Sequence, residues 1–130
     1  MPVRSVTPIL NVSDVAASIE WFEAIGFTWP RGAEPDFGSV ISDHAEIFLC
    51  LGGQGSQGEP PQFPGDEATG GVWLSWWVGS PAEVDELHSF ALEHGLDVSR
   101  QPIDEPWGIR EFHLRHPDGH TFRVSAHLGD

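Results

Sequence analysis

The sequence has 130 residues, enough for one domain with a buried core. Its 39% hydrophobic and 20% charged residues are typical of a folded globular protein and exclude a disordered chain. No apolar run reaches the roughly 20 residues that cross a bilayer, so we expect no membrane partner.

The formal net charge of −14, from 6 Lys+Arg against 20 Asp+Glu, argues against nucleic-acid binding. Such binding depends on cations that neutralise backbone phosphates. The acidity either serves solubility alone or attracts cationic partners, and the sequence leaves both readings open. The single cysteine, Cys50, cannot form an intrachain disulfide, and residues 1–4 lack the pattern of a secretory signal. The expected location is therefore the cytoplasm.

A strand and a helix are predicted first. Residues 6–12 form a short β-rich run, and the Ser-Asp pair after it offers a helix N-cap. Val15, Ile19 and Phe22 follow at spacings of four and three, which predicts the apolar stripe of a helix. Gly26 is placed to end that helix in a left-handed conformation.

The same plan returns later in the chain. Residues 72–78 form a dense apolar strand, and residues 80–83 form a capping box with proline at the first helical position. The helix stripe then consists of Val84, Leu87, Phe90 and Ala91. Gly95 closes the helix, so the chain is predicted to contain two modules of similar design.

Short strands follow each predicted helix. They lie near residues 37–42 and 46–51 in the first module, and near 97–101, 109–115 and 121–127 in the second. A His-Pro-Asp-Gly turn precedes the last strand, and we expect His116 and His120 at its ends to be exposed.

The Gly-, Pro- and Gln-rich residues 52–71 lie between the modules and are predicted to form a mobile loop. Phe63 within this loop is either a lid over a ligand or part of a disordered stretch. The expected organisation is one domain, with module one at residues 1–51, the linker at 52–71 and module two at 72–130.

Three stretches carry a family resemblance. They are PILNVSDVA at residues 8–16 with Trp21-Phe22 and Gly26-Phe27 after it, Asp36-Phe37, and PWGIREF at residues 106–112 followed by LRHPDG at 114–119. In this order and spacing they resemble the vicinal-oxygen-chelate superfamily, and within it the antibiotic-sequestering bleomycin-resistance proteins. The resemblance implies an α+β fold of two βαβββ modules with concave mixed sheets. It also implies a homodimer that exchanges its N-terminal strand, with Pro8 at the hinge.

Many members of that superfamily are metalloenzymes with His, Gln or Glu ligands on the inner strand faces. The residues that match those ligand positions are Thr7, Phe48, Trp73 and Arg123. They are not a plausible ligand set, and Arg123 would place a fixed cation where the ion binds. We therefore predict no metal and no cofactor. A new site at His113, His116 and His120 is the alternative, and it would require these donors to converge.

Catalytic chemistry is not evident in the sequence. Nothing near Cys50 supplies the base that a nucleophile needs, and no phosphate-binding loop or nucleophile elbow is present. General acid–base work by Glu46, Glu111 or His113 stays open. We expect a binding protein and not an enzyme. The alternative is a glyoxalase-like, dioxygenase-like or cofactor-free enzyme of the same fold.

Strand alternation and loop position select the expected ligand-binding residues. They are Asn11, Trp29, Phe37, Phe48, Trp73, Trp77, Trp107, Glu111, His113 and Arg123. In the family resembled, the residues matching Phe37 and Trp107 line the drug site. The alternatives are a core role for Trp107 and a plain surface position for Trp29.

Broad aromatic planes with few charges suit a large, flat, partly polar ligand. The hypothesis is that the protein binds and sequesters an aromatic, DNA-damaging antibiotic without turnover. A bleomycin-class glycopeptide is the first candidate, because it is cationic and carries flat heteroaromatic groups, and an enediyne or polycyclic antibiotic is the second. A partner-binding module with a filled cleft is a further alternative.

Overall fold

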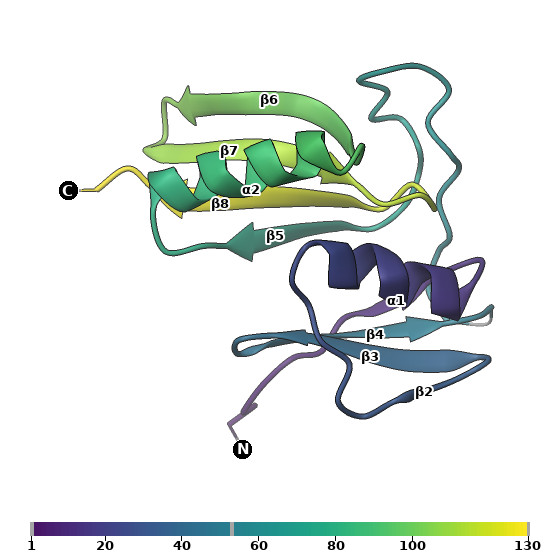
Figure 1. The fold of residues 1–130 in the computed structure, drawn as a ribbon. Helices are drawn as coiled ribbons and strands as arrows, with labels where there is room; N and C mark the ends of the chain where they lie inside the picture. Colours follow the sequence, from purple (N-terminus) through teal and green to yellow (C-terminus); the bar gives the residue numbers. More distant parts are fainter. Residues whose placement is uncertain (1, 53, 130) are drawn as a thin grey trace. The chain divides into compact units, whose positions relative to one another are not determined.

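The computed structural model describes residues 2–52 and 54–129. The chain forms two compact units, Met1–Gln57 and Gly58–Asp130 (Figure 1). The boundary between them lies inside the predicted linker, so residues 58–71 belong to the second unit. None of the helices in the described residues is long and apolar enough to span a membrane.

The first unit is a four-stranded mixed sheet with one helix on it. Its elements are β1 (Ile9–Asn11), α1 (Val15–Ala24), β2 (Ala33–Glu34), β3 (Phe37–Ser42) and β4 (Ala45–Cys50). The strand order is β1-β4-β3-β2, in which β1 runs parallel to β4 and the other pairs are antiparallel. Figure 1 shows α1 lying along one face of this sheet.

Helix α1 forms where the local pattern predicts it. Asp14 is the N-cap, and its side chain accepts a hydrogen bond from the Ala17 backbone N–H at 3.0 Å. The stripe of Val15, Ile19 and Phe22 is buried against the sheet. Gly26 has a φ of +96°, the left-handed conformation expected just after a helix end. The strands add Leu10, Val12, Val40, Ile47 and Leu49 to this core.

The second unit repeats the arrangement of the first. Its elements are β5 (Trp73–Trp77), α2 (Pro81–Glu93), β6 (Asp97–Glu105), β7 (Ile109–Arg115) and β8 (Thr121–His127). The strand order is β5-β8-β7-β6, with β5 parallel to β8 and the other pairs antiparallel. The predicted α+β fold of two βαβββ modules with mixed sheets is confirmed. Strand β6 is longer than expected, and its pairing with β7 contains register shifts.

Helix α2 has the predicted N-cap but a shifted capping box. The Ser80 hydroxyl accepts from the Glu83 backbone N–H at 3.3 Å, whereas the Glu83 carboxylate accepts from Gly79 N–H at 2.6 Å instead of from Ser80. The helix covers a core that includes Val84, Ala91, Phe112, Leu114, Phe122, Val124 and Ala126. Trp76 stacks on Phe122 at 4.1 Å within this layer.

Residues 58–71 fold against the turn between β7 and β8. Glu59 N–H donates to the Thr69 carbonyl, and the Thr69 hydroxyl donates to the Gly119 carbonyl, both at 2.7 Å. Gly119 has a φ of +86°, and a Cβ placed on it would lie 2.5 Å from the Glu59 carbonyl oxygen. The predicted loop is therefore tied to the second module by direct backbone contact.

Two histidines at this turn, which we expected to be exposed, are buried. His116 is 1% exposed and His120 is fully buried, so that prediction was wrong. The Asp118 backbone N–H donates to His116 Nδ1, and Val72 N–H donates to His120 Nδ1, each at 3.0 Å. Burial, assisted by the neighbouring His120 and opposed by Asp118, lowers the pKa of His116 to about 4. Both rings thus support the turn that residues 58–71 cover.

Candidate functional site

Each sheet has one face covered by its helix and one face turned away from it. In the first unit, a Cβ on Gly38 would touch Val15 and Ile19 of α1, so the neighbouring Phe37 and Ser39 lie on the opposite face. We call the set Asn11, Phe37, Ser39, Glu46 and Phe48 the first open face.

In the second unit, His88 of α2 contacts Phe112 at a ring distance of 5.3 Å, so the residues on either side of Phe112 point away from the helix. The second open face is the set Trp73, Trp77, Glu111, His113, Arg123 and Ser125. The two-residue alternation of side chains along a strand therefore predicted correctly which strand residues lie on the open face of each sheet.

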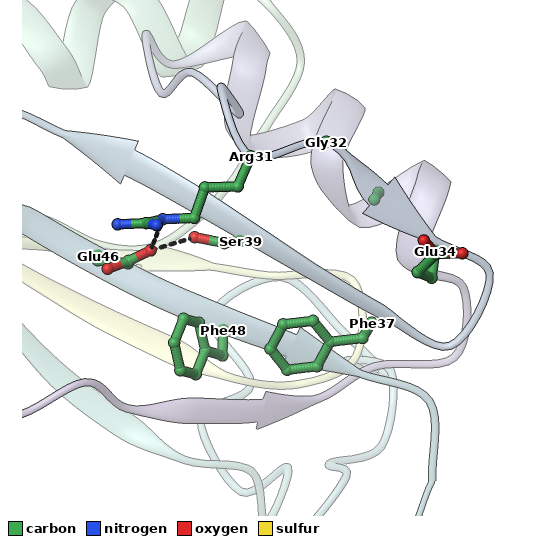
Figure 2. Close-up of a pocket in the computed structure, with 8 residues that line it drawn as sticks. Arg31, Gly32, Glu34, Phe37, Ser39, Glu46 and Phe48 are labelled. Atoms are coloured by element: carbon green, nitrogen blue, oxygen red, sulfur yellow. Dashed lines mark hydrogen bonds and ion pairs between the residues drawn. The ribbon is translucent and has the colours of Figure 1, made fainter.

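The first open face contains a pocket of about 370 Å³. Its lining residues are Arg31, Gly32, Ala33, Glu34, Phe37, Ser39, Glu46 and Phe48 (Figure 2). The rings of Phe37 and Phe48 lie side by side, with centroids 5.1 Å apart and a tilt of 57°. Phe37 is 40% exposed. The pair forms an accessible aromatic wall on which a planar ligand can stack.

Glu46 supplies the charge beside that wall. Its Oε2 accepts a hydrogen bond from the Ser39 hydroxyl at 2.5 Å and from Arg31 Nε at 2.8 Å (Figure 2). The Ser39 hydrogen bond and the charge of Arg31 outweigh desolvation and hold the pKa of Glu46 below its usual value. The pocket therefore presents a carboxylate that is ionised at neutral pH.

The Asn11 side chain forms hydrogen bonds with the backbone of the segment after β4. Its Oδ1 accepts from Gly52 N–H at 3.1 Å, and its Nδ2 donates to the Gly55 carbonyl at 3.3 Å. The side chain is 8% exposed. Asn11 thus lies on the predicted face, where it fastens the segment after β4.

A buried ion pair lies on the second open face. Arg123 reaches both carboxylate oxygens of Glu111, with Nε–Oε2 at 3.0 Å and Nη2–Oε1 at 3.1 Å. The Ser125 hydroxyl donates to Oε2 at 3.1 Å. Glu111 is only 2% exposed, so these donors offset the cost of burying its charge.

His113 has a carboxylate partner that the sequence did not reveal. Its Nδ1 lies 2.6 Å from Glu67 Oε2, which also accepts from the Ser99 hydroxyl at 2.8 Å. Burial alone would raise the pKa of Glu67, but these hydrogen bonds outweigh it and hold the pKa below its usual value. The Trp73 ring packs edge-on against His113 at 5.4 Å. Glu67 was missed because it lies in the stretch interpreted as linker.

The remaining predicted tryptophans have exposed side chains. Trp77 is 56% exposed and stacks on His127 at 4.9 Å. Trp107 is 59% exposed at the turn between β6 and β7, so the alternative of a core role for it is excluded. Trp29 is 42% exposed between α1 and β2. These rings are therefore accessible to a ligand, but they lie on three different segments of the chain.

The residues that the family resemblance matches to metal ligands do not fit a divalent ion. Phe48 and Trp73 offer a phenyl and an indole in place of a donor, and the Arg123 guanidinium is paired with Glu111. The fourth position is Thr7, just before β1. Within residues 2–52 and 54–129, no group of three or more His, Cys, Asp or Glu side chains is arranged to hold a metal.

Comparison with known proteins identifies the family. The model of the Glyoxalase/Bleomycin resistance protein/Dioxygenase superfamily matches residues 4–124. The chain belongs to this superfamily. A search of curated proteins finds no match.

Solved structures share the fold of this chain at low sequence identity. A glyoxalase/bleomycin resistance protein/dioxygenase from Nocardioides is 19% identical, with 98% of this chain and 86% of that chain covered and a TM-score of 0.72. A bleomycin-binding protein complexed with bleomycin is 14% identical, with 98% and 100% covered and a TM-score of 0.70. Lactoylglutathione lyase from Agrobacterium tumefaciens is 17% identical, with 97% and 96% covered and a TM-score of 0.74.

Proposed function

We propose that this protein binds and sequesters a flat aromatic antibiotic without chemical turnover. The observation that carries the proposal is the Phe37–Phe48 wall beside the ionised Glu46 in an open pocket. Stacking on the rings and attraction to the carboxylate favour a ligand with flat and cationic parts. Bleomycin-class glycopeptides have this chemistry, and enediyne or polycyclic antibiotics share its flat part.

The contacts of Glu111 and Cys50 support binding of a ligand without catalysis. Glu111 is committed to Arg123 and Ser125, and the buried Cys50 thiol donates to the Gln54 carbonyl at 3.5 Å. A nucleophile needs a nearby base and a free approach, and neither group has both. We therefore propose a binding protein and not an enzyme, acting in the cytoplasm on a small molecule without nucleic-acid or membrane partners.

One observation favours a second candidate, a proton-transfer enzyme of the same fold. The 2.6 Å contact between His113 and Glu67 is the arrangement that orients a histidine for general acid–base chemistry. The lactoylglutathione lyase among the similar structures also supports an enzymatic function, but only by analogy of fold. Recovery of a chemically altered ligand after incubation with the protein would favour this candidate.

We also propose the homodimer that the family resemblance implies. Val3 and Val6 before β1 are 80% and 83% exposed, so this segment carries apolar surface that a second copy would cover. Size-exclusion chromatography with light scattering tests this directly. A mass of one chain at micromolar concentration would contradict it.

Fluorescence titration tests the proposed binding. Six tryptophans make saturable quenching by bleomycin or a polycyclic antibiotic, at about one ligand per chain, the expected result. Phe48→Ala removes half of the wall and should weaken binding about tenfold, because a lost stack and its buried area together are worth about 1.4 kcal/mol or more. The matched control is Leu92→Ala, which removes a 53% exposed apolar side chain from α2 and should leave binding unchanged. A chain that responds to no antibiotic of either class would contradict the proposal.

A further inference from the structure

We propose that Glu46 is the subsite for a planar cationic group on the ligand, and that Arg31 fills this subsite until the ligand displaces it. The group is an amidinium or guanidinium attached to an aromatic ring. The inference rests on the proposed function, because it assumes that the Phe37–Phe48 pocket binds a flat ligand.

The carboxylate of Glu46 is only partly used by Arg31. Both hydrogen bonds to it, from Ser39 and from Arg31 Nε, reach Oε2. In the part of the chain that the structure describes, Oε1 receives no hydrogen bond. Planar cations bind carboxylates best through two parallel N–H···O bonds, one to each oxygen. An incoming amidinium can therefore make a contact that Arg31 does not make here.

Arg31 is also weakly held. Its side chain is 66% exposed, whereas that of Glu46 is 23% exposed. Exposed ion pairs of this kind change an equilibrium by about fivefold or less, because water and side-chain entropy offset the attraction. Arg31 lies in the connection between α1 and β2, next to Gly32 with a φ of +73°. Its displacement requires no rearrangement of the sheet.

The distance between the Phe37–Phe48 wall and the Glu46 carboxylate suits a ligand that has an aromatic ring with a cationic substituent. Glu46 and Phe48 are two residues apart on β4 and share a face, so their Cα atoms are about 7 Å apart. Figure 2 shows the Phe48 ring beside the Glu46 carboxylate, with Phe37 next along the wall. A ring stacked on Phe48 would therefore carry its cationic substituent to Glu46.

The charge around the pocket favours a cation after Arg31 has left. The lining contains two carboxylates, Glu34 and Glu46, and one cation, Arg31. Displacement of Arg31 leaves the Glu46 carboxylate without its counter-charge on a lining that also includes Glu34, which favours a positive ligand over a neutral or negative one. The subsite therefore selects by charge, while the wall selects by shape.

Paired ligands test the inference. Benzamidine and benzamide have nearly the same shape, but only benzamidine is cationic, and NMR titration measures both affinities. We expect benzamidine to bind the wild-type protein at least tenfold more tightly than benzamide. Arg31→Gln should strengthen benzamidine binding about threefold and leave benzamide unchanged. Glu46→Gln should abolish the preference, while Glu20→Gln, on the exposed part of α1, should preserve it.

A direct readout of displacement is the ¹⁵Nε–H signal of Arg31, which should shift on addition of benzamidine and not of benzamide. Loss of benzamidine affinity in Arg31→Gln, or an unchanged preference in Glu46→Gln with native circular dichroism, would overturn the inference. If antibiotics bind but benzamidine and benzamide bind alike, the inference fails and the proposed function stands. If antibiotics, benzamidine and benzamide all fail to bind, the proposed function fails too.

Discussion

Buried His116 makes the stability of the fold depend on pH between 7 and 5. Burial lowers the pKa of His116 from 6.5 to about 4, and the neighbouring His120 adds to this effect while Asp118 opposes it. Between these two pKa values the unfolded chain binds more protons than the folded chain. Stability is therefore highest above pH 6.5 and falls as the pH drops toward 4. At about 1.4 kcal/mol per pKa unit the total loss is between about 3 and 4 kcal/mol, of which about 2 kcal/mol falls between pH 7 and 5.

The matched variant is His116→Asn. Its side-chain oxygen can accept the Asp118 N–H bond now made to His116 Nδ1, but it does not titrate. Urea unfolding at pH 7 and 5, at constant ionic strength, should show that the wild type loses about 2 kcal/mol more than the variant. The control is His44→Asn, a residue with 98% side-chain exposure between β3 and β4, which should behave as the wild type. An equal pH dependence in wild type and His116→Asn would refute the reasoning.

Three further predictions concern stability. Gly119→Ala should destabilise the protein about 2 kcal/mol more than Gly108→Ala in thermal unfolding. Both glycines have a φ near +87°, so the backbone strain of an alanine is the same at each, but only at Gly119 would the added Cβ lie 2.5 Å from a backbone oxygen, that of Glu59. Equal losses would contradict this packing. Glu111→Gln should cost about 2 kcal/mol in urea unfolding, because Arg123, 36% exposed and so still partly hydrated, would then face a neutral amide. A loss below about 0.5 kcal/mol would contradict that role. EDTA should leave the melting temperature unchanged, because the positions matched to metal ligands hold the phenyl of Phe48, the indole of Trp73 and the paired guanidinium of Arg123. A drop of several degrees would show that a bound metal stabilises the protein and would contradict this reasoning.

Local signals predicted the helices and the alternation of the strands correctly. Caps at Asp14 and Ser80, and apolar stripes at helical spacing, depend on neighbours within a turn or two, so the sequence displays them directly. The face on which Glu111 and His113 lie follows from the two-residue period of a strand, which is equally local.

Contacts between distant segments account for what the sequence did not reveal. The bond from Thr69 to Gly119 joins residues 50 positions apart, and no local pattern indicates it. Local composition predicts a mobile loop over residues 52–71, whereas residues 58–71 pack on this turn. The turn pattern likewise predicts an exposed His116, which is 1% exposed. The same error hid Glu67, the partner of His113. Arg31 was missed for a related reason, since a charged loop residue gives no sign of the strand residue it will reach.

Native mass spectrometry against a panel of DNA-damaging antibiotics tests the central claim most directly. It reports the mass of the complex and of the ligand released from it in one measurement. The account predicts a complex with one ligand per chain for a flat, cationic antibiotic, and release of that antibiotic at its original mass. Absence of any complex across the panel, or release of a ligand with altered mass, would contradict it.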